Sequence, residues 1–409
     1  MVARADQAVI LVGGLGSRLG SLTADTPKPL LPVAGRPFLE IQIEEIARQG
    51  VRRFLLLAAF ASDQVRDFAA ALPRKLGMDI SVEIAIEPDR AGTGGAIWHA
   101  RDRLDDLFFL FNGDSWFDIP LADVAAALPD DDGVLGVLSL RPLPAAGRYG
   151  VVTLDGDRID DFAAAAPAEG APALVNAGVY LFRRAMVERL EPLCSLERDT
   201  MPKLVAERAL IGHVAEGYFL DIGIPADYAR AQTEIPARRR KPALFLDRDG
   251  VINIDHGHVG TIDRFEWVEG AAETIRLANR LGFYVFVVTN QAGIGKGMYG
   301  EADYFALRRH IRDGLAERGA HIDDERHCPF HPEASVEAFR RASDRRKPEP
   351  GMIFDLLDRW PVDRARSLLI GDRESDLAAA RAAGIEAHLF AGGNLADFAR
   401  GLLTAGKAP

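Results

Sequence analysis

Two aspartates separated by a single residue, Asp247 and Asp249, directly follow the apolar run Ala243–Leu246. Two carboxylates at one strand end suit phosphoryl transfer, because one can attack phosphorus while the other protonates the leaving alkoxide and then deprotonates water. A nucleophilic carboxylate is already ionised at neutral pH, but it needs positive charge nearby because it must approach an anion. Asp-x-Asp alone fits a polar turn equally well, so the interpretation depends on what else the chain supplies.

The same half of the chain supplies further groups in a consistent order. An apolar run ends at Thr289 and Asn290, whose hydroxyl and amide can bind phosphoryl oxygens. Lys347, preceded by Arg346, can supply the cation. The stretch from Asp372 to Asp376 follows a third apolar run and supplies carboxylates for a metal ion, with Asp372 as the expected ligand. Four such pieces together predict catalysis through an aspartyl phosphate.

A glycine-rich turn after the first apolar run predicts a phosphate site in the other half. Gly13, Gly14 and Gly16 allow the backbone to approach a phosphate chain with its N–H groups. The third glycine of the dinucleotide fingerprint and the Gly-Lys-Ser/Thr of the P-loop are both absent. Arg18 and Lys28 add two cations to the turn, as a triphosphate site requires.

Two distant aspartates are expected to hold a divalent cation beside that turn. Asp114 follows an apolar run, and Asp221 comes much later in the chain. Carboxylates at strand ends beside phosphates are natural Mg²⁺ ligands. A second turn, formed by Gly92, Thr93 and Gly94, precedes a helical pattern and leaves room for a base or ribose against the backbone.

Short apolar runs that alternate with helix-length stretches must position these groups. Phe54–Leu57 and Ile80–Ile86 are typical of buried strands, whereas Phe38–Gln49 and Asp63–Leu72 are typical of helices. The alternation predicts an α/β fold with two doubly wound, mostly parallel sheets. Ligands then bind outside the carboxyl ends of the strands.

The strand–helix pattern restarts after a stretch of low apolar content. Residues 234–242 contain two prolines and four adjacent cations, which predict a linker, with an anion-binding patch as the alternative. We therefore expect one domain over residues 1–233 and a second over residues 243–409.

Composition restricts the classes of function. The 409 residues include 49 basic and 60 acidic side chains, for a net charge of −11, which argues against nucleic-acid binding. Two cysteines make no disulfide framework and fit a reducing cytosol. No apolar run approaches the ~20 residues that a membrane-spanning helix needs. We expect a cytoplasmic protein with small-molecule substrates, and the sequence leaves the oligomeric state open.

Residues 7–233 resemble the sugar-1-phosphate nucleotidyltransferases. The resemblance is carried by the two glycine turns, Pro27-Lys-Pro-Leu30, Asn112-Gly-Asp114, the segment from Asn176 to Gly178, and Asp221-Ile-Gly223. Arg148-Tyr-Gly150 and Ser195-Leu-Glu-Arg-Asp199 are similar to the branch that guanylylates D-glycero-α-D-manno-heptose 1-phosphate.

The resemblance implies direct displacement, in which a sugar-1-phosphate oxygen attacks the α-phosphorus of GTP and pyrophosphate leaves. Asp114 and Asp221 would hold Mg²⁺, Arg18 the leaving pyrophosphate and Lys28 the reacting phosphates. Asn176 would contact the sugar, and the glycines, with Thr93 and Gly178, would line the nucleotide and sugar sites.

Two departures from the family's motifs concern residues expected to bind the sugar phosphate. The family's Glu-Lys pair after Phe162 is replaced by Ala163-Ala164, and the Pro-Leu before the second glycine turn is replaced by Arg90-Ala91. We expect weakened binding of the sugar phosphate and an intact nucleotide site.

Residues 243–395 resemble the haloacid-dehalogenase (HAD) phosphatases of the heptose- and histidinol-phosphate branch. The motifs are Phe245-Leu-Asp-Arg-Asp-Gly250, Asn253-Ile-Asp-His-Gly257, Thr289-Asn-Gln-Ala-Gly293 and Arg346-Lys-Pro-Glu-Pro-Gly-Met352.

That resemblance implies that Asp247 is the nucleophile and Asp249 the acid/base. Mg²⁺ would be bound by Asp247, the Asp249 carbonyl and Asp372, while Thr289 and Lys347 hold the phosphoryl group. Asn290 would assist them, and Arg346 and Arg373 are candidates for a distal phosphate of the substrate.

Relatives in this branch often carry a zinc loop of three cysteines and a histidine. Here only Cys328 remains, and Phe330, Ser343 and Arg345 stand at the other ligand positions. Structural zinc needs four ligands, so we predict no zinc.

Together the resemblances imply nucleotide activation of a heptose. The second half would remove the 7-phosphate of D-glycero-D-manno-heptose 1,7-bisphosphate, and the first half would transfer GMP from GTP to the resulting 1-phosphate. Two alternatives remain open at this point: the same chemistry on mannose or another hexose, and a first half that only binds sugar phosphates.

Overall fold

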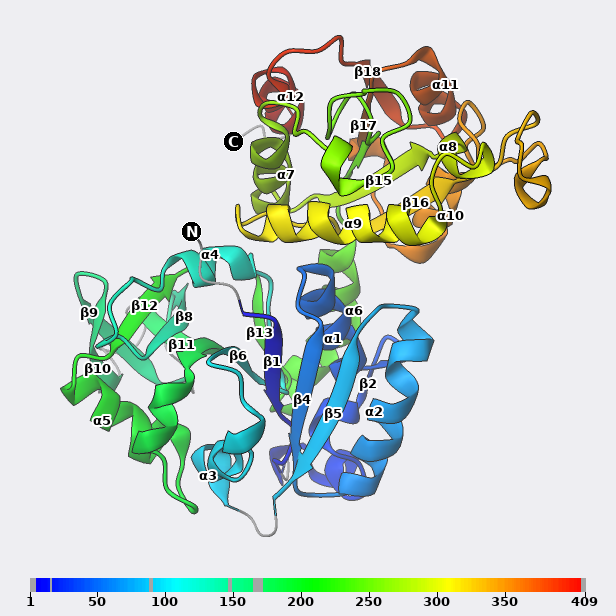
Figure 1. The fold of residues 1–409 in the computed structure, drawn as a ribbon. Helices are drawn as coiled ribbons and strands as arrows, with labels where there is room; N and C mark the ends of the chain where they lie inside the picture. Colours follow the sequence, from blue (N-terminus) through cyan, green and yellow to red (C-terminus); the bar gives the residue numbers. More distant parts are fainter. Residues whose placement is uncertain (1–4, 15–16, 88–90, 146–148, 165–171, 406–409) are drawn as a thin grey trace. The chain divides into compact units, whose positions relative to one another are not determined.

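The computed structural model describes residues 5–14, 17–87, 91–145, 149–164 and 172–405. The chain forms two compact units, one ending at Arg238 and the other beginning at Arg239 (Figure 1). Each unit has its own sheets and its own hydrophobic clusters. Within the described residues, no helix has both the length and the apolar character that crossing a membrane requires.

The N-terminal unit is built on a nine-stranded sheet with the order β5-β4-β1-β6-β11-β8-β12-β10-β9. Its strands are β1 (Gln7–Leu11), β4 (Arg53–Ala58), β5 (Ser81–Ile86), β6 (Leu107–Asn112), β8 (Gly136–Leu143), β9 (Val151–Asp155), β10 (Arg158–Ala164), β11 (Ala173–Arg183) and β12 (Leu210–Val214). Two small sheets pair β7 (Ser115–Phe117) with β13 (Phe219–Asp221), and β2 (Pro32–Val33) with β3 (Arg36–Pro37).

The nine-stranded sheet is parallel in one half and mainly antiparallel in the other. β5, β4, β1 and β6 are mutually parallel, whereas β11 runs antiparallel to both β6 and β8. The expected α/β class is confirmed, but parallel pairing is confined to the strands β5 to β6 and the pair β8–β12. The reason is that apolar runs reveal buried strands without encoding their direction.

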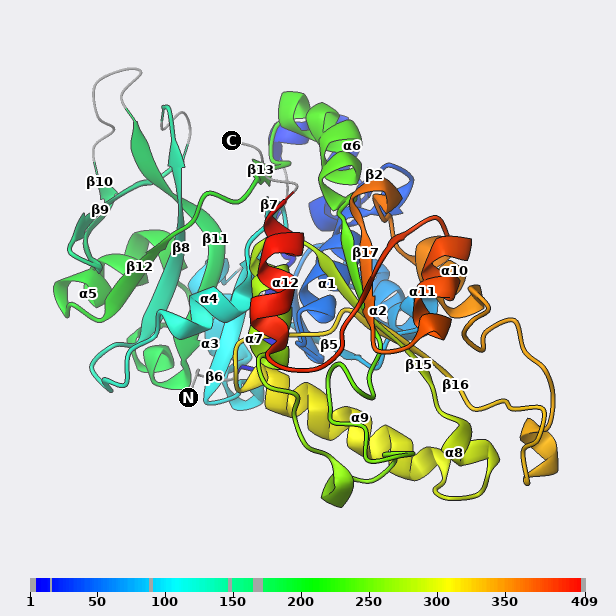
Figure 2. The same cartoon turned by 90° about the horizontal axis from the view of Figure 1, so that it is seen from above.

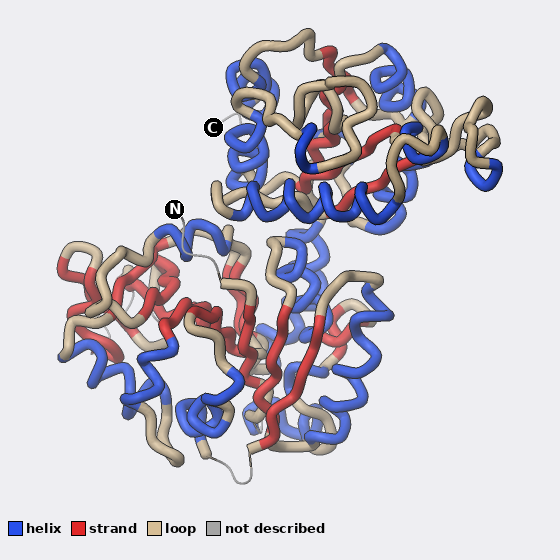
Figure 3. Tube along the Cα trace, viewed as in Figure 1, coloured by secondary structure: helices blue, strands red, loops and turns tan. Residues whose placement is uncertain are grey.

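Helices cover both faces of this sheet (Figure 3). They are α1 (Phe38–Arg48), α2 (Ser62–Leu76), α3 (Gly92–His99), α4 (Leu121–Ala126) and α5 (Met201–Ala206). The sixth helix, α6 (Pro225–Arg239), packs instead against α1 and the β7–β13 pair. Ile43 of α1, Val65 of α2 and Val124 of α4 belong to one apolar cluster, and Ile97 of α3 and Leu204 of α5 belong to the other. Strands covered on both sides must be apolar throughout, which explains their uninterrupted hydrophobic runs.

The C-terminal unit contains a five-stranded sheet in which every strand pairing is parallel. The order is β16-β15-β14-β17-β18, formed by β14 (Ala243–Leu246), β15 (Tyr284–Asn290), β16 (Asp324–Cys328), β17 (Leu368–Gly371) and β18 (Glu386–Leu389). The central strand β14 is fully buried between β15 and β17. Residues that follow β14 therefore emerge between the ends of two neighbouring strands.

Two groups of helices enclose this sheet. They are α7 (Ala271–Arg280), α8 (Ala292–Gly295), α9 (Glu301–Ala316), α10 (Gly351–Arg359), α11 (Glu374–Ala382) and α12 (Leu395–Thr404). Ile275 of α7, Leu307 of α9 and Ala399 of α12 pack on one face, and Ile353 of α10 and Ala379 of α11 on the other. Figure 2 shows α7 and α12 side by side.

Part of the stretch expected to be a linker, residues 234–242, is helical. Helix α6 continues through Pro236 and ends at Arg239. The carbonyl of Arg239 accepts a 2.7 Å hydrogen bond from the Tyr284 hydroxyl, and the Lys241 amide donates to the Pro361 carbonyl. The physical reason is that alanine and arginine favour helix, so one proline does not interrupt it here.

Candidate active sites

A buried lysine lies between two buried aspartates at the carboxyl end of the five-stranded sheet. Lys347 Nζ is 2.8 Å from Asp247 Oδ1 and 2.7 Å from Asp376 Oδ1. It also donates a 2.7 Å hydrogen bond to the carbonyl of Val288 in β15. The structure thus brings the expected nucleophile and the expected cation into direct contact, with their charges paired away from water.

Burial dominates the electrostatics of this cluster. It raises the pKa of the Asp247 carboxyl to about 7, against the lowering effect of Lys347 and with a further rise from Asp376. Burial, followed by Asp376, also raises the pKa of Asp372. Burial lowers the pKa of Lys347, but the two aspartates outweigh it and raise that pKa above its usual value. An ionised nucleophile here requires additional positive charge.

The carboxylates at this strand end fit a divalent metal ion. Oxygens of Asp247, Asp372 and Asp376 all lie within 4.8 Å of one another. Asp372 Oδ1 is buried and has no hydrogen-bond partner among the described residues, whereas both oxygens of Asp376 accept hydrogen bonds, from Lys347 and from the Arg373 amide. Asp247 and Asp372 are therefore the two carboxylates best placed to bind a hard cation.

Asp249 is held by several donors. Its Oδ1 accepts hydrogen bonds from Arg248 Nη2 (2.8 Å) and Asn253 Nδ2 (3.0 Å), and its Oδ2 accepts from Gln291 Nε2 (3.0 Å). The Asp249 side chain is not part of the three-carboxylate group. If Asp249 binds the metal ion, it would do so through its main-chain carbonyl, as the resemblance implies.

The residues at the carboxyl end of β15 have different tasks. Gln291 Nε2 donates a 2.8 Å hydrogen bond to Thr289 Oγ1, which leaves the Thr289 hydroxyl proton for another acceptor. The Asn290 side chain donates to the Lys347 carbonyl (3.0 Å) and accepts from the Lys347 amide (3.1 Å). The amide expected to bind the phosphoryl group is thus engaged with the main chain of the lysine and positions it.

A cavity of about 430 Å³ opens above this cluster. Asp247, Asp249 and Lys347 line it, together with Arg346 and Arg373. Two further cations in one cavity with a phosphoryl site allow a substrate with two separate phosphate groups to bind.

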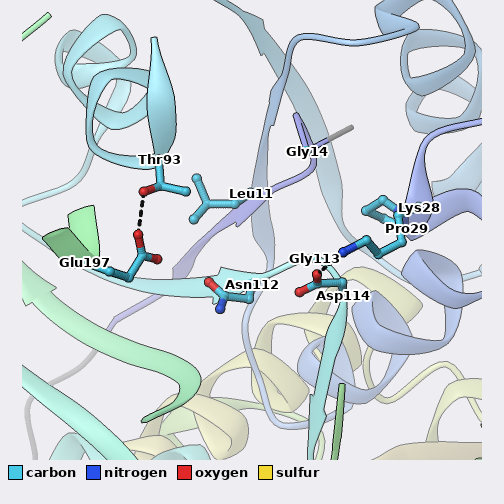
Figure 4. Close-up of a pocket in the computed structure, with 9 residues that line it drawn as sticks. All are labelled: Leu11, Gly14, Lys28, Pro29, Thr93, Asn112, Gly113, Asp114 and Glu197. Carbon is cyan, nitrogen blue, oxygen red and sulfur yellow. Dashed lines mark hydrogen bonds and ion pairs between the residues drawn. The ribbon is translucent and has the colours of Figure 1, made fainter. Parts of the chain in front are cut away.

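A smaller cavity of about 160 Å³ lies at the carboxyl ends of β1 and β6 in the N-terminal unit (Figure 4). Gly14, Lys28, Thr93 and Asp114 line it, as does Glu197. Figure 4 shows the Lys28–Asp114 ion pair on one side and the Thr93–Glu197 hydrogen bond on the other. Residues from five separate segments of the sequence meet here.

The pairing of β7 with β13 brings the two expected metal ligands together. Asp221 is the register partner of Ser115, the residue after Asp114, and the Ile222 amide donates a 2.9 Å hydrogen bond to the Asp114 carbonyl. A Cβ built on Gly223 would lie 2.6 Å from Asp221 Oδ1 and 3.5 Å from Lys28 Nζ. Asp114, Asp221 and Lys28 therefore share one small space, and their oxygen donors suit a divalent cation.

The glycine turns are only partly defined. A Cβ added at Gly13 would lie only 3.2 Å from side-chain atoms of Ala59 and Glu87. Gly16 lies outside the described residues. Arg18 is exposed on the short segment Ser17–Thr23. Gly92 adopts a φ of +79°, and a Cβ there would meet the Cys194 carbonyl at 2.5 Å, so this position requires glycine.

The expected sugar contact, Asn176, is fixed by a buried tyrosine. Asn176 Nδ2 donates a 2.7 Å hydrogen bond to Tyr180 Oη, and Asn176 Oδ1 accepts from the Gly178 amide at 3.2 Å. Gly178 has a φ of +72°, and a Cβ there would lie 2.6 Å from Asn112 Nδ2. Neither Asn176 nor Gly178 is among the described residues that line the smaller cavity.

Two site residues were given no role from the sequence. Gln291 stands two positions after Thr289, and Glu197 lies in the short π-helical turn Leu196–Thr200. Both belong to motifs that carry the family resemblances, but their contacts with Asp249 and Thr93 join distant parts of the chain. Asp376, from the stretch expected to supply carboxylates for the metal, is one of the three carboxylates gathered at this strand end.

Comparison with known proteins agrees with this geometry. Residues 7–238 match the family model described as nucleotidyl transferase. The chain belongs to the nucleotidyl transferase family. In this nucleotidyl transferase, residues 344–400 also match the model for HAD-hydrolase-like proteins.

Individual relatives cover each half. A D-glycero-beta-D-manno-heptose-1,7-bisphosphate 7-phosphatase of Rhodopseudomonas palustris is 50% identical over 164 residues, 40% of this chain and 91% of the relative. The enzyme of the same name from Escherichia coli K12 is 44% identical over 35% of this chain and 75% of its own length. The crystal structure of HddC from Yersinia pseudotuberculosis matches 56% of this chain and 99% of its own, with 29% identity and a TM-score of 0.50.

These matches establish a two-part enzyme. The N-terminal half of the chain has the fold of the nucleotidyl transferase family. The C-terminal half is a phosphatase of the HAD type. Both families generally act with a divalent metal ion on small molecules. The expected fusion of two activities is confirmed.

Proposed function

We propose that this chain carries out two consecutive steps in the nucleotide activation of a heptose. The C-terminal half hydrolyses the 7-phosphate of D-glycero-D-manno-heptose 1,7-bisphosphate, and the N-terminal half transfers GMP from GTP to the 1-phosphate that remains. The observation that carries the proposal is the name of the phosphatase relatives, a 1,7-bisphosphate 7-phosphatase, beside a nucleotidyl transferase match in the same chain. Removal of a 7-phosphate from a 1,7-bisphosphate leaves a sugar 1-phosphate, which is a suitable acceptor for nucleotidyl transfer.

In the phosphatase step, Asp247 attacks phosphorus. Asp249, which lines the same cavity, protonates the leaving alkoxide and then deprotonates the water that releases phosphate. Lys347 and the Thr289 hydroxyl stabilise the phosphoryl oxygens, and Arg346 and Arg373 bind the 1-phosphate.

In the transferase step, Lys28 binds the reacting phosphates and Arg18 the leaving pyrophosphate. Asn176, held by Tyr180, contacts the sugar. The glycine turns leave room for the nucleotide against the backbone. No covalent intermediate with the protein is required, because the sugar phosphate itself is the nucleophile.

Mg²⁺ is the proposed metal in both halves. Asp247, Asp372 and the Asp249 carbonyl would hold it in the phosphatase, and Asp114 and Asp221 in the transferase. When bound, the ion offsets negative charge on the reacting phosphate. A cytoplasmic location follows from the nucleotide and sugar-phosphate substrates that the proposal assigns.

The proposal is tested by a coupled assay on the full chain. Each anomer of the heptose bisphosphate is offered with GTP, ATP, CTP or UTP, and phosphate and pyrophosphate are followed separately. We expect phosphate release without nucleotide, and pyrophosphate release that needs both GTP and prior dephosphorylation. Pyrophosphate release with mannose 1-phosphate but not with the heptose would overturn the assigned sugar. Phosphate release with no pyrophosphate under any condition would show that the first half only binds.

Both anomers belong in that assay. The curated relatives are named for the β anomer, whereas the sequence motifs of the first half resemble enzymes that use the α anomer. A preference of both halves for one anomer is expected if they act in sequence. Opposite preferences would contradict consecutive action.

A further inference from the structure

Arg248 has no part in the chemistry described so far, although it stands between the two catalytic aspartates. Its side chain is only 2% exposed. It is not among the residues that line the phosphatase cavity, whereas Asp249 is. A guanidinium buried away from the substrate acts through the groups that it touches, because an unpaired buried charge is costly.

The main target of Arg248 is Asp249. Arg248 Nη2 lies 2.8 Å from Asp249 Oδ1 and 3.0 Å from Asp249 Oδ2, and Arg248 Nε lies 3.2 Å from Asp249 Oδ1. The guanidinium therefore engages both carboxylate oxygens. Such planar pairing restricts rotation of a carboxylate more than a single hydrogen bond does.

Further contacts fix the Arg248 side chain in place. Its Nη2 donates to the carbonyl of Val259, and its guanidinium carbon lies 5.8 Å from the centre of the Tyr304 ring. The Tyr304 hydroxyl donates to Glu325, which forms a 2.8 Å ion pair with Arg308. The arginine is thus seated on a buried polar network that extends to β16.

We propose that Arg248 is a positioning residue of the phosphatase, which holds Asp249 in the orientation from which it exchanges protons with the substrate. The inference rests on the proposed acid/base role of Asp249. In the first step the Asp247–phosphorus bond forms, the phosphorus–alkoxide bond breaks, and the Asp249 proton moves to the alkoxide oxygen. In the second, water attacks phosphorus, its proton moves to Asp249, and the Asp247–phosphorus bond breaks to release phosphate. Arg248 exchanges no proton in either step.

The choice of leaving group separates this role from a purely structural one. An alkoxide needs a proton as it leaves, whereas p-nitrophenolate leaves readily without one. Loss of Asp249 orientation therefore slows alkyl esters selectively. A general distortion of the site slows both kinds of ester alike.

The experiment compares Arg248→Met, Arg248→Lys, Asp249→Asn and the double variant Arg248→Met/Asp249→Asn on the full chain. The substrates are a sugar bisphosphate and p-nitrophenyl phosphate. For Arg248→Met we expect kcat to fall about 10–100-fold on the sugar phosphate and less than about 3-fold on the aryl ester. The larger loss is part of the roughly 100–10,000-fold that acid–base catalysis usually contributes. KM stays close to that of the unmodified chain. Arg248→Lys, which can bind one oxygen, shows the same selectivity with a smaller loss.

The double variant is expected to be no slower on the sugar phosphate than Asp249→Asn alone. Arg318→Met is the matched control, because Arg318 is a partly exposed arginine of the same unit that stacks on Trp267. It should leave both rates unchanged. Thermal unfolding of the C-terminal unit reports whether each variant has folded, and if Arg248→Met does not fold, Arg248→Lys decides.

Equal losses on both esters, or an additive loss in the double variant, would overturn the role of Arg248. Selectivity in Asp249→Asn without selectivity in Arg248→Met defeats this inference alone. Absence of selectivity in Asp249→Asn defeats the proposed acid/base assignment as well.

Discussion

Lys28 Nζ lies 2.6 Å from Asp114 Oδ2, so a cation expected to bind phosphate and a carboxylate expected to bind metal are in direct contact. Nucleotide and metal ion would each replace one partner of this pair. We therefore expect the two residues to act together, with Asp221 alongside them.

Asp114→Asn is predicted to lower transferase kcat at least about 100-fold, because the charge that holds the cation at the reacting phosphate is removed. The magnesium concentration required for half-maximal rate should rise. Pyrophosphate release measures the loss, and phosphate release by the other half of the same chain is the control. An unchanged magnesium requirement would contradict the assignment of Asp114.

Lys347→Met is predicted to lower phosphatase activity by about 100-fold or more, because the buried side-chain cation that offsets charge between Asp247 and the phosphoryl group is lost. It should also destabilise the C-terminal unit by about 3–5 kcal/mol, since Asp247 and Asp376 are left buried without their cation. Thermal unfolding measures the second effect. Adding Asp376→Asn should recover part of the stability and none of the activity.

His327 predicts a pH dependence of stability. Burial lowers the pKa of its imidazole to about 4, below the usual 6.5. The unfolded chain therefore binds more protons between these values, so the stabilisation is present above pH 6.5 and is lost as the pH falls towards 4. The contribution is about 1–3 kcal/mol.

His327→Phe should flatten the rise in melting temperature of the C-terminal unit between pH 4 and 6.5. Phenylalanine keeps the ring contacts with Tyr304 and Phe305. His256→Gln, at an exposed histidine, serves as the control. An identical slope in His327→Phe and the unmodified chain would argue against the assigned titration.

Restoring the Glu-Lys pair at positions 163 and 164 is predicted to lower the KM of the transferase for its sugar phosphate. The KM for GTP should stay the same, because the substitutions lie at the end of β10 and not in the nucleotide turns. Steady-state kinetics of Ala163→Glu/Ala164→Lys measures both. An unchanged sugar KM counts against weakened binding in the natural sequence.

The loop after β16 is predicted to need no zinc. Cys328 is buried, and burial raises the pKa of its thiol, which disfavours the thiolate that zinc requires. The Arg341 guanidinium packs 3.9 Å from the centre of the ring of Phe330, the residue at one of the ligand positions that the family resemblance implies. Metal analysis of the purified protein checks this. Stoichiometric zinc that disappears in Cys328→Ser would refute it.

Strand positions and the residues at their ends were accessible from the sequence. Asp247, Lys347 and Asp372 follow apolar runs or lie in compact motifs, and parallel strands bring such ends to one edge. The meeting of Asp114 with Asp221 was expected from the resemblance, whereas its structural cause, the short β7–β13 pair, was not.

Other features depended on contacts that no local pattern encodes. The antiparallel half of the first sheet arises from long-range pairing of β11. The residue type of Asn290 suggested a side-chain amide available to bind the phosphoryl group. In the folded chain both polar atoms of that amide form hydrogen bonds with the main chain of Lys347. The sequence indicated a linker over residues 234–242 but not the helix that reaches Arg239, because two prolines and four adjacent cations obscure helix propensity there.

Among the residues that the structure describes, each large sheet and each apolar cluster is built from one unit alone. A mutation that destabilises the core of one unit can therefore leave the other unit folded, so that one reaction is lost while the other continues. Because the two cores are separate, mutations that change the substrate selectivity of one unit need not change the packing of the other.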